Sequence, residues 1–282
     1  SDEKYMDYCF KIILSCLIYD KRERIELYIK KIENVGIKLP SSKSADKLNL
    51  HRMRVKYLLE LYDRINQNGQ NERAQQAYIN FCRAMEQHGL YGALACLCSP
   101  ENKILLEFAE TVNILKSSQN FEVNKYLVSI FIETVTGRED LKEGLLELSR
   151  RINPLLCKCF TADLSVGLLK QLQNIIMHDT ISVTRQQCIS LLESTDDEKD
   201  QKGLLMFMHG IYDYKSLVKG VMLSEFISNE RKAELRLEIY SLCLEVYEDN
   251  MPFYFLCAEA LMDLKDYGQA IEYYRFVAEY KG

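Results

Sequence analysis

Apolar residues recur three and four positions apart along almost the whole chain, with polar residues between them. This is the spacing of one face of an α-helix, so we expect helices rather than strands. The first helix is expected over residues 4–34, with a break near Asp20-Lys21. The same spacing predicts helices over residues 55–62, 72–87, 90–98, 101–115, 123–136, 141–152, 168–176, 182–193, 204–212, 217–227, 231–248, 253–264 and 267–280.

Stretches rich in Ser, Pro or charge mark the expected connections between these helices. Residues 40–44 (PSSKS) form the clearest loop, and Ser99-Pro100-Glu101 predicts a helix start, with Ser as the cap and Pro in the first turn. Residues 193–200 (ESTDDEKD) are the most polar stretch. We therefore expect a boundary there, between an irregular helical array over 1–195 and helical hairpins over 201–282 that are continuous with it.

The last part of the chain carries the most specific pattern. Residues 253–280 read as two short amphipathic helices joined by Lys265-Asp266, with the small residues Ala258 and Ala270 where the two backbones approach each other. The second helix carries Tyr-x-x-Ala-Ile-x-x-Tyr from Tyr267 to Tyr274. This pattern resembles a tetratricopeptide repeat, and it covers about a tenth of the chain.

A shift of 34 residues aligns Ser224 with Ala258 and predicts a degenerate repeat one period earlier, although Arg236 then replaces the small Ala270 and Gly220 replaces the aromatic Tyr254. The resemblance implies an all-α array of antiparallel helix hairpins, an α-solenoid that is tetratricopeptide-like at its C-terminal end. It also implies a concave groove for a partner peptide. The positions implied to line this groove are Phe255, Glu259, Met262 and, one period earlier, Val221, Glu225 and Ser228. The competing interpretation is a face covered by a further repeat or another domain.

Composition agrees with a helical chain and narrows its setting. Gly and Pro together number 16 of 282 residues, which favours helices with short connections. The net charge of −5 gives no general attraction to nucleic acid. The apolar stretch over residues 8–19 is too short to span a bilayer and follows acidic residues, unlike a secretory leader. With ten scattered cysteines, we expect unpaired thiols, a cytoplasmic location and no membrane partner.

Few residues carry recognisable chemistry. Cys96-x-Cys98 and Cys157-x-Cys159 are spaced too closely for zinc ligands on a helix, where residues two apart point in different directions. The four histidines are isolated from one another. The run from Asp196 to Asp200 fits the DDxxD pattern with which isoprenoid synthases hold magnesium, but it lacks an apolar helical context and reads as a solvated linker. We expect no cofactor and no metal.

Three functions follow from these patterns. The first is a non-catalytic protein- or peptide-binding helical-repeat scaffold. The second is the helical accessory region of a larger bacterial enzyme or regulator, such as a glycosyltransferase or a peptide-sensing regulator, associated with a neighbouring domain of the same parent chain. The third is a magnesium-dependent helical enzyme that uses Asp196, Asp197 and Asp200. Because the chain begins without Met and stops just after the second helix of the repeat, we expect a piece of a longer protein.

Overall fold

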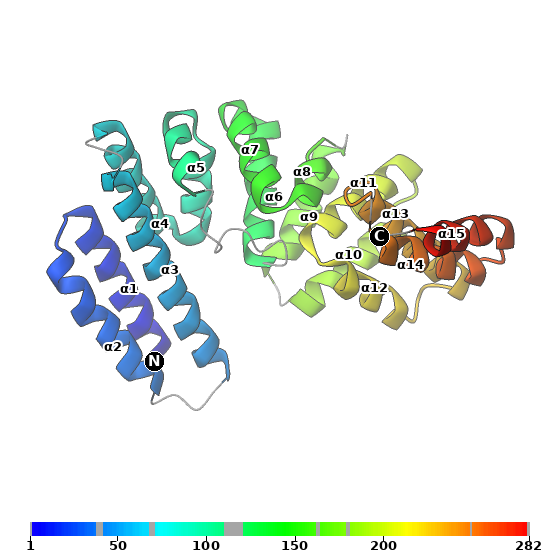
Figure 1. The fold of residues 1–282 in the computed structure, drawn as a ribbon, viewed down its shortest axis with the longest axis horizontal. Coiled ribbons are helices and arrows are strands. Elements are labelled where there is room, and N and C mark those ends of the chain that lie inside the picture. The colour runs from blue at the N-terminus through cyan, green and yellow to red at the C-terminus, as the bar shows by residue number, and fades with distance from the viewer. Residues whose placement is uncertain are drawn as a thin grey trace. The chain divides into compact units, whose positions relative to one another are not determined.

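The computed structural model describes residues 2–37, 42–67, 71–109, 121–161, 164–178, 181–248 and 250–280. Fifteen α-helices and three short 3-10 helices account for most of these residues, and the described part of the chain contains no β-strand (Figure 1). The all-α class predicted from the spacing of apolar residues is therefore confirmed.

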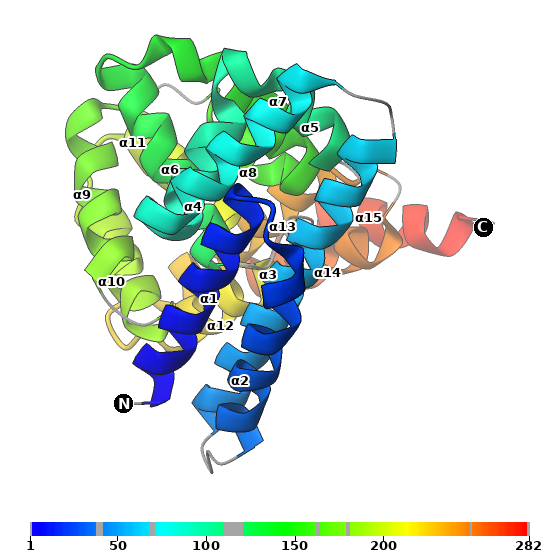
Figure 2. The ribbon, with the colours of Figure 1, turned by 90° about the vertical axis from the view of Figure 1, so that its left-hand side faces the viewer.

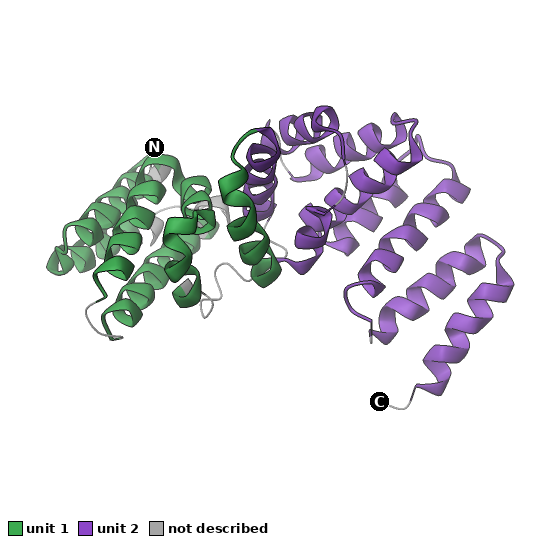
Figure 3. Cartoon of the chain, turned by 90° about the horizontal axis from the view of Figure 1, so that it is seen from above, with its two compact units in different colours: residues 1–117, 137–152 green, residues 118–136, 153–282 purple. Residues whose placement is uncertain are grey.

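The chain divides into two compact units (Figure 3). Unit 1 consists of residues Ser1–Ser117 and Gly137–Ile152, and unit 2 of Ser118–Thr136 and Asn153–Gly282. The helices of unit 1 are α1 (Asp2–Ile18), η1 (Arg22–Arg24), α2 (Ile25–Ile37), α3 (Ser42–Gln67), α4 (Glu72–Cys98), η2 (Pro100–Asn102), α5 (Lys103–Ala109), η3 (Glu139–Leu141) and α7 (Lys142–Ile152). The helices of unit 2 are α6 (Phe121–Thr136), α8 (Pro154–Cys159), α9 (Val166–His178), α10 (Ile181–Glu193), α11 (Glu198–Ile211), α12 (Tyr214–Leu223), α13 (Asn229–Leu244), α14 (Met251–Asp263) and α15 (Tyr267–Glu279).

In unit 1, α1 packs against α2, α3 and α4, and Figure 2 shows the first three of these helices running beside one another. The break expected near residue 20 is present, because α1 ends at Ile18 and Asp20 has a φ of 51° in the turn that follows. A second break lies inside α4, where Gly89 has a φ of 60°. It separates the two helices that the apolar pattern predicts over 72–87 and 90–98.

The core of unit 2 is aromatic. Phe131 stacks on Phe160 with ring centroids 4.6 Å apart, and Phe207 packs against both rings. Beside this cluster, the buried side chain of Asn153 donates hydrogen bonds to Asn124 Oδ1 and to the carbonyl oxygen of Gly210. These bonds join α6 and α11 to the start of α8.

Two of the connections expected from the sequence differ in part from the structure. Residues 42–44 of the expected 40–44 loop belong to the first turn of α3, whereas residues 38–41 lie outside the described part. Ser99 occupies the cap position and Pro100 the first turn of η2, as expected, but the Ser99 side chain makes no capping hydrogen bond. Residues 110–120, with part of the helix expected over 101–115, are not described. The polar run over 193–200 spans the end of α10, the connection over 194–197 and the start of α11, all within unit 2, and the boundary that we expect there stays a prediction.

Candidate functional site

The C-terminal hairpin of α14 and α15 is set by local signals. Pro252 lies in the first turn of α14, where its missing N–H costs nothing. Lys265 adopts a φ of 62° in the connecting turn, and Asp266 caps α15 by accepting a hydrogen bond from the Gln269 backbone N–H at 3.1 Å. The two helices pack against each other along their length.

One face of α14 is buried and the other is open. Cys257, Ala258 and Leu261 are buried, as the apolar pattern predicts. Phe255 and Met262 are 46% and 42% exposed, and Glu259 is exposed between them. Residues four and seven positions apart lie on the same face of a helix, so these three side chains share one surface.

A residue that we did not predict completes this surface. The Tyr274 hydroxyl on α15 donates a hydrogen bond to Glu259 Oε1, and its ring meets Phe255 edge-on with centroids 5.7 Å apart. The hydrogen bond to Glu259 raises the pKa of Tyr274. We refer to Phe255, Glu259, Met262 and Tyr274 as the α14 surface.

The positions expected one period earlier do not repeat this arrangement. Val221 is fully buried, so it is unavailable to a partner, which corrects the prediction for this residue. The reason is that α12 packs against α10: a Cβ on Gly220 would lie 3.0 Å from Ile189 Cδ1. Glu225 is exposed in the turn after α12, and Ser228 is exposed and caps α13 by accepting from the Arg231 backbone N–H at 3.1 Å.

The face of α15 that carries Tyr267, Ala270 and Ile271 is partly open. Ala270 is buried, as expected for a small residue between two close helices. Tyr267 and Ile271, however, are 53% and 54% exposed. Ala258 and Ala270 are therefore both buried where the two helices pack, while apolar side chains beside them on α15 are half exposed.

A polar cavity of about 520 Å³ lies between α13 and the end of α14. Three cations and two anions line it, and within this set Arg236 Nη2 donates a hydrogen bond to Asp263. The Arg236 Nε atom is buried and has no hydrogen-bond partner among the described residues. The charged residues of the lining are Glu230, Lys232, Arg236, Asp263 and Lys265.

The acidic run between α10 and α11 has a structural use. Asp197 caps α11, and its carboxylate accepts a hydrogen bond from the Asp200 backbone N–H at 2.9 Å. Asp196 and Asp197 are exposed rather than turned into a cavity. In the described residues, no three His, Cys, Asp or Glu side chains converge as a metal-binding group would.

His209 and Cys243 are as close as the two residues of a catalytic dyad, but burial shifts both pKa values so that each side chain stays neutral. His209 Nε2 lies 3.1 Å from Cys243 Sγ, and both side chains are buried. Burial lowers the pKa of His209 to about 4 and raises the pKa of Cys243 to about 12. A nucleophilic cysteine needs a lowered pKa, so this thiol stays protonated and the pair serves packing between α11 and α13.

Because the pKa of buried His209 is lowered, we expect the fold to lose stability in acid. Its folded-state pKa of about 4 lies below the ordinary 6.5, so the unfolded chain binds the proton more readily. The contribution of neutral His209 to the free energy of unfolding is therefore fully present above pH 6.5. It falls by about 3 kcal/mol as the pH drops toward 4. We expect His209→Leu to flatten this acid limb in urea unfolding measured from pH 7 to 4. His88→Leu, at an exposed position, should keep the slope of the unchanged protein.

The cysteines of the two Cys-x-Cys sequences contribute to packing. Cys96 and Cys98 lie on α4, and Cys157 and Cys159 lie on α8. Burial raises the pKa of Cys96 to about 11 and that of Cys98 further. Such thiols are poor nucleophiles and poor metal ligands.

Comparison with known proteins adds no relative: the chain matches no family of proteins, no curated protein and no solved structure. Among the described helices, none combines the length and the apolar character that crossing a bilayer requires.

Proposed function

We propose that this chain is a non-catalytic helical-repeat protein that binds a protein or peptide on the α14 surface. The observation that carries the proposal is the exposure of Phe255 and Met262 on either side of Glu259, on a helix whose opposite face is buried at Cys257, Ala258 and Leu261. Aromatic residues and Met are enriched where proteins bind partners, and they supply much of the binding energy.

The packing order of the last four helices supports a repeat arrangement. α12 packs on α13, α13 on α14, and α14 on α15, each helix against its neighbour in sequence. This is how tetratricopeptide-like hairpins stack in an α-solenoid. In such an array, a hairpin leaves one helix face open, and the α14 surface occupies that position.

The chemistry of the α14 surface indicates the kind of segment it accepts. Phe255 and Met262 offer apolar contact, while the Glu259 carboxylate already accepts a hydrogen bond from Tyr274 and has further lone pairs for a donor. A peptide with an apolar side chain next to a Lys, an Arg or a hydroxyl residue matches both features.

To test the proposal, peptides are selected from a display library for binding to this protein. We expect Phe255→Ala and Met262→Ala each to weaken binding of the selected peptides about thirtyfold or more, because truncating a central apolar anchor costs about 2 kcal/mol or more. Isothermal titration calorimetry gives the affinities, and circular dichroism checks that each variant is folded.

Phe226→Ala is the matched control, because Phe226 is 95% exposed but lies in the turn between α12 and α13. It should leave the affinities unchanged. If the selected peptides bind all three variants as tightly as the unchanged protein, the α14 surface is not their binding site.

The magnesium-dependent alternative has its own measurement. Replacing Asp196, Asp197 and Asp200 together by Asn should leave Mg²⁺ binding unchanged in a calorimeter, because the Asp197 carboxylate serves as a helix cap. Asn also caps helices well, so the triple variant should stay folded. A site that binds Mg²⁺ in the unchanged protein and is lost in this variant would favour the enzyme.

A further inference from the structure

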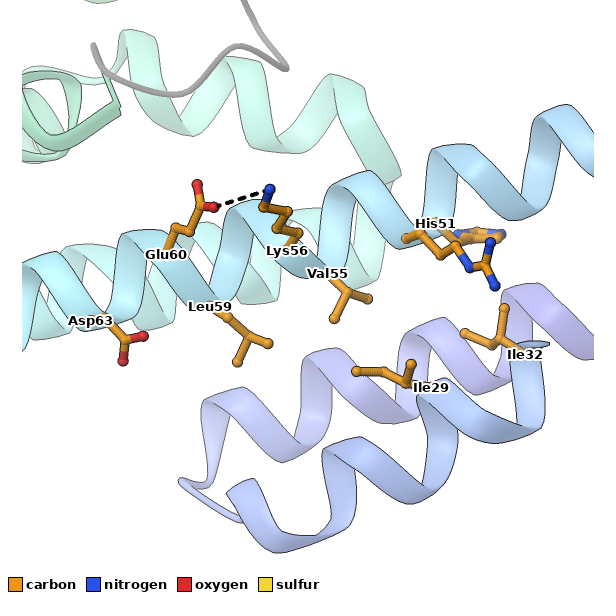
Figure 4. A pocket seen from close by; sticks show the side chains of 9 residues that line it. Ile29, Ile32, His51, Val55, Lys56, Leu59, Glu60 and Asp63 are labelled. Atoms are coloured by element: carbon orange, nitrogen blue, oxygen red, sulfur yellow. Dashed lines mark ion pairs between the residues drawn. The ribbon is translucent and has the colours of Figure 1, made fainter. Parts of the chain in front are cut away.

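Two cavities of the protein differ in how the charges around them are paired. In unit 1, a groove of about 270 Å³ lies between α2 and α3, and apolar side chains from both helices contribute to its wall. The charged residues of its rim form ion pairs within the protein, so a charged ligand finds no unpaired opposite charge among the described residues of this groove. These pairs join Lys56 to Glu60, drawn in Figure 4, Arg52 to Glu33 and Asp63 to Arg22.

The polar cavity between α13 and the end of α14, in unit 2, keeps unpaired charge. It holds about 520 Å³, and among its three cations Arg236 is paired, with Asp263. In the described part of the chain, no carboxylate forms an ion pair with Lys232 or Lys265. The remaining charged residue of the lining, Glu230, is exposed. The cavity therefore offers two ammonium groups that no protein group pairs.

Both lysines extend from backbone that hydrogen bonds hold in place. Lys232 lies in the first turn of α13, where its N–H donates to the Ser228 carbonyl oxygen at 2.9 Å. Lys265 lies in the turn after α14, and its N–H donates to the Met262 carbonyl oxygen at 3.0 Å. These two helix ends bring both lysines to one cavity, so binding there requires little ordering of the main chain.

Arg236 contributes charge rather than a further hydrogen bond from Nε. Its side chain is 18% exposed, and its Nη2 donates to the Asp263 carboxylate. The Nε atom is buried, so a ligand in the cavity does not reach it. The ion pair offsets the negative charge of Asp263, which would otherwise repel an anion beside the two lysines.

We propose that this cavity binds a small hydroxylated organic molecule with one carboxylate, such as a sugar acid. The lining carries three cations and two anions, so its charge sums to +1. One carboxylate neutralises this charge, whereas a phosphate monoester, with about −1.5 to −2, exceeds it. Lys232 and Lys265 donate to the carboxylate, and the Asn229 amide and the Glu230 carboxylate bind hydroxyl groups. The volume equals that of roughly 17 water molecules, which is enough for a six-carbon chain.

Gluconate and sorbitol are the matched ligands for the test, because both are open six-carbon chains and only gluconate carries a carboxylate. Each is titrated into the full chain, and the backbone amide NMR signals of residues 229–232 and of Lys265 are followed. We expect gluconate to shift these signals saturably, with an affinity that falls as the salt concentration rises. Sorbitol should bind at least fivefold more weakly. No saturable gluconate binding, or equal affinity for the two molecules, would overturn the proposal.

Charge variants locate the site. Lys232→Gln and Lys265→Gln should each weaken gluconate binding about two- to fivefold, the usual effect of one partly exposed ion pair. Glu230→Gln should strengthen it by a similar factor, because a like charge is removed. Lys219→Gln is the matched control, since Lys219 is exposed on α12 and outside the lining, and it should leave the affinity unchanged.

Three results of these titrations contradict the proposal. Lys232→Gln and Lys219→Gln could bind gluconate equally well, which would place the ligand elsewhere. Weaker binding by Glu230→Gln would mean that the cavity does not repel anions through this residue. Tighter binding of glucose 6-phosphate than of gluconate would make the cavity a phosphate site instead of a carboxylate site. Circular dichroism shows whether each variant is folded.

Discussion

Asn153→Asp is expected to destabilise unit 2 by about 4 kcal/mol at neutral pH, although the two side chains have the same shape. Asn153 is 2% exposed, and its Nδ2 donates to Asn124 Oδ1 at 3.1 Å and to the Gly210 carbonyl oxygen at 2.7 Å. An aspartate places lone pairs and a negative charge against both acceptors. Each lost donor leaves a buried acceptor unsatisfied, at about 1–3 kcal/mol, and the buried charge adds to this.

Asn153 also caps α8, and aspartate keeps this capping hydrogen bond, so the loss of a helix cap does not contribute to the expected effect. Asn153 Oδ1 accepts from the Leu156 backbone N–H at 3.1 Å at the start of α8. An aspartate keeps this acceptor, so any destabilisation comes from the other side of the side chain, where α6 and α11 meet it. Asn153→Ala would lose the cap as well and would not distinguish the two causes.

The destabilisation should grow with pH. Burial and the two facing carbonyl oxygens favour the neutral acid, so the pKa of the new carboxyl is raised above the unfolded value of about 3.9. A raised folded-state pKa leaves the stability intact below the unfolded pKa and removes it as the pH rises through the folded pKa. We therefore expect a smaller loss of unfolding free energy at pH 5 than at pH 8, measured in urea against the unchanged protein.

Asn250→Asp provides the matched control, because Asn250 precedes α14 but its side chain makes no capping hydrogen bond. The free energy of unfolding should change by less than about 0.5 kcal/mol there, with a small gain from the negative charge at a helix start. If both substitutions cost the same at pH 8, the network around Asn153 does not hold the three helices together.

The sequence predicts the helices well because helix formation depends on local spacing. Apolar residues repeating every 3.6 positions and a few stop signals suffice to locate the break at Asp20, the kink at Gly89 and the hairpin of α14 and α15. For the same reason, the exposed positions of Phe255, Glu259 and Met262 follow directly from the buried face on the other side of α14.

The contacts between helices are what the spacing cannot supply. Periodicity identifies an apolar face but not the element that covers it, so Val221 was expected in a groove although α10 packs against its helix. Tyr274 has the spacing of the apolar face of its helix, yet its hydroxyl donates a hydrogen bond to Glu259 on α14, a contact that spacing does not predict.

The polar pairs of the interior are equally hidden from the sequence. His51 meets Asp7 from 44 positions away, and His209 meets Cys243 from 34 positions away. Each residue looks isolated along the chain, because only the register of one helix against another brings the partners together. Asn153 looks like a simple helix stop, yet its amide joins three helices.

Gly144→Ala should destabilise unit 1 by about 3 kcal/mol or more, against the usual gain of a Gly→Ala change in a helix. Gly144 lies where α7 crosses α4, and a Cβ built on it would be 2.0 Å from the Cys98 carbonyl oxygen and 2.8 Å from Cys98 Cα. These are backbone atoms, so no side-chain rotation relieves the clash, and the two helices must separate.

Gly167→Ala tests whether the close approach, rather than the loss of glycine, causes this effect. Gly167 also lies in a helix, but its nearest neighbour for a Cβ is Ser165 Oγ at 4.0 Å. The same substitution there should stabilise the protein by about 0.4–1 kcal/mol, because alanine restricts the unfolded chain more than glycine does. Urea unfolding of the two variants should therefore shift in opposite directions, and a shift of Gly144→Ala toward higher urea would mean that α4 and α7 do not meet at this residue.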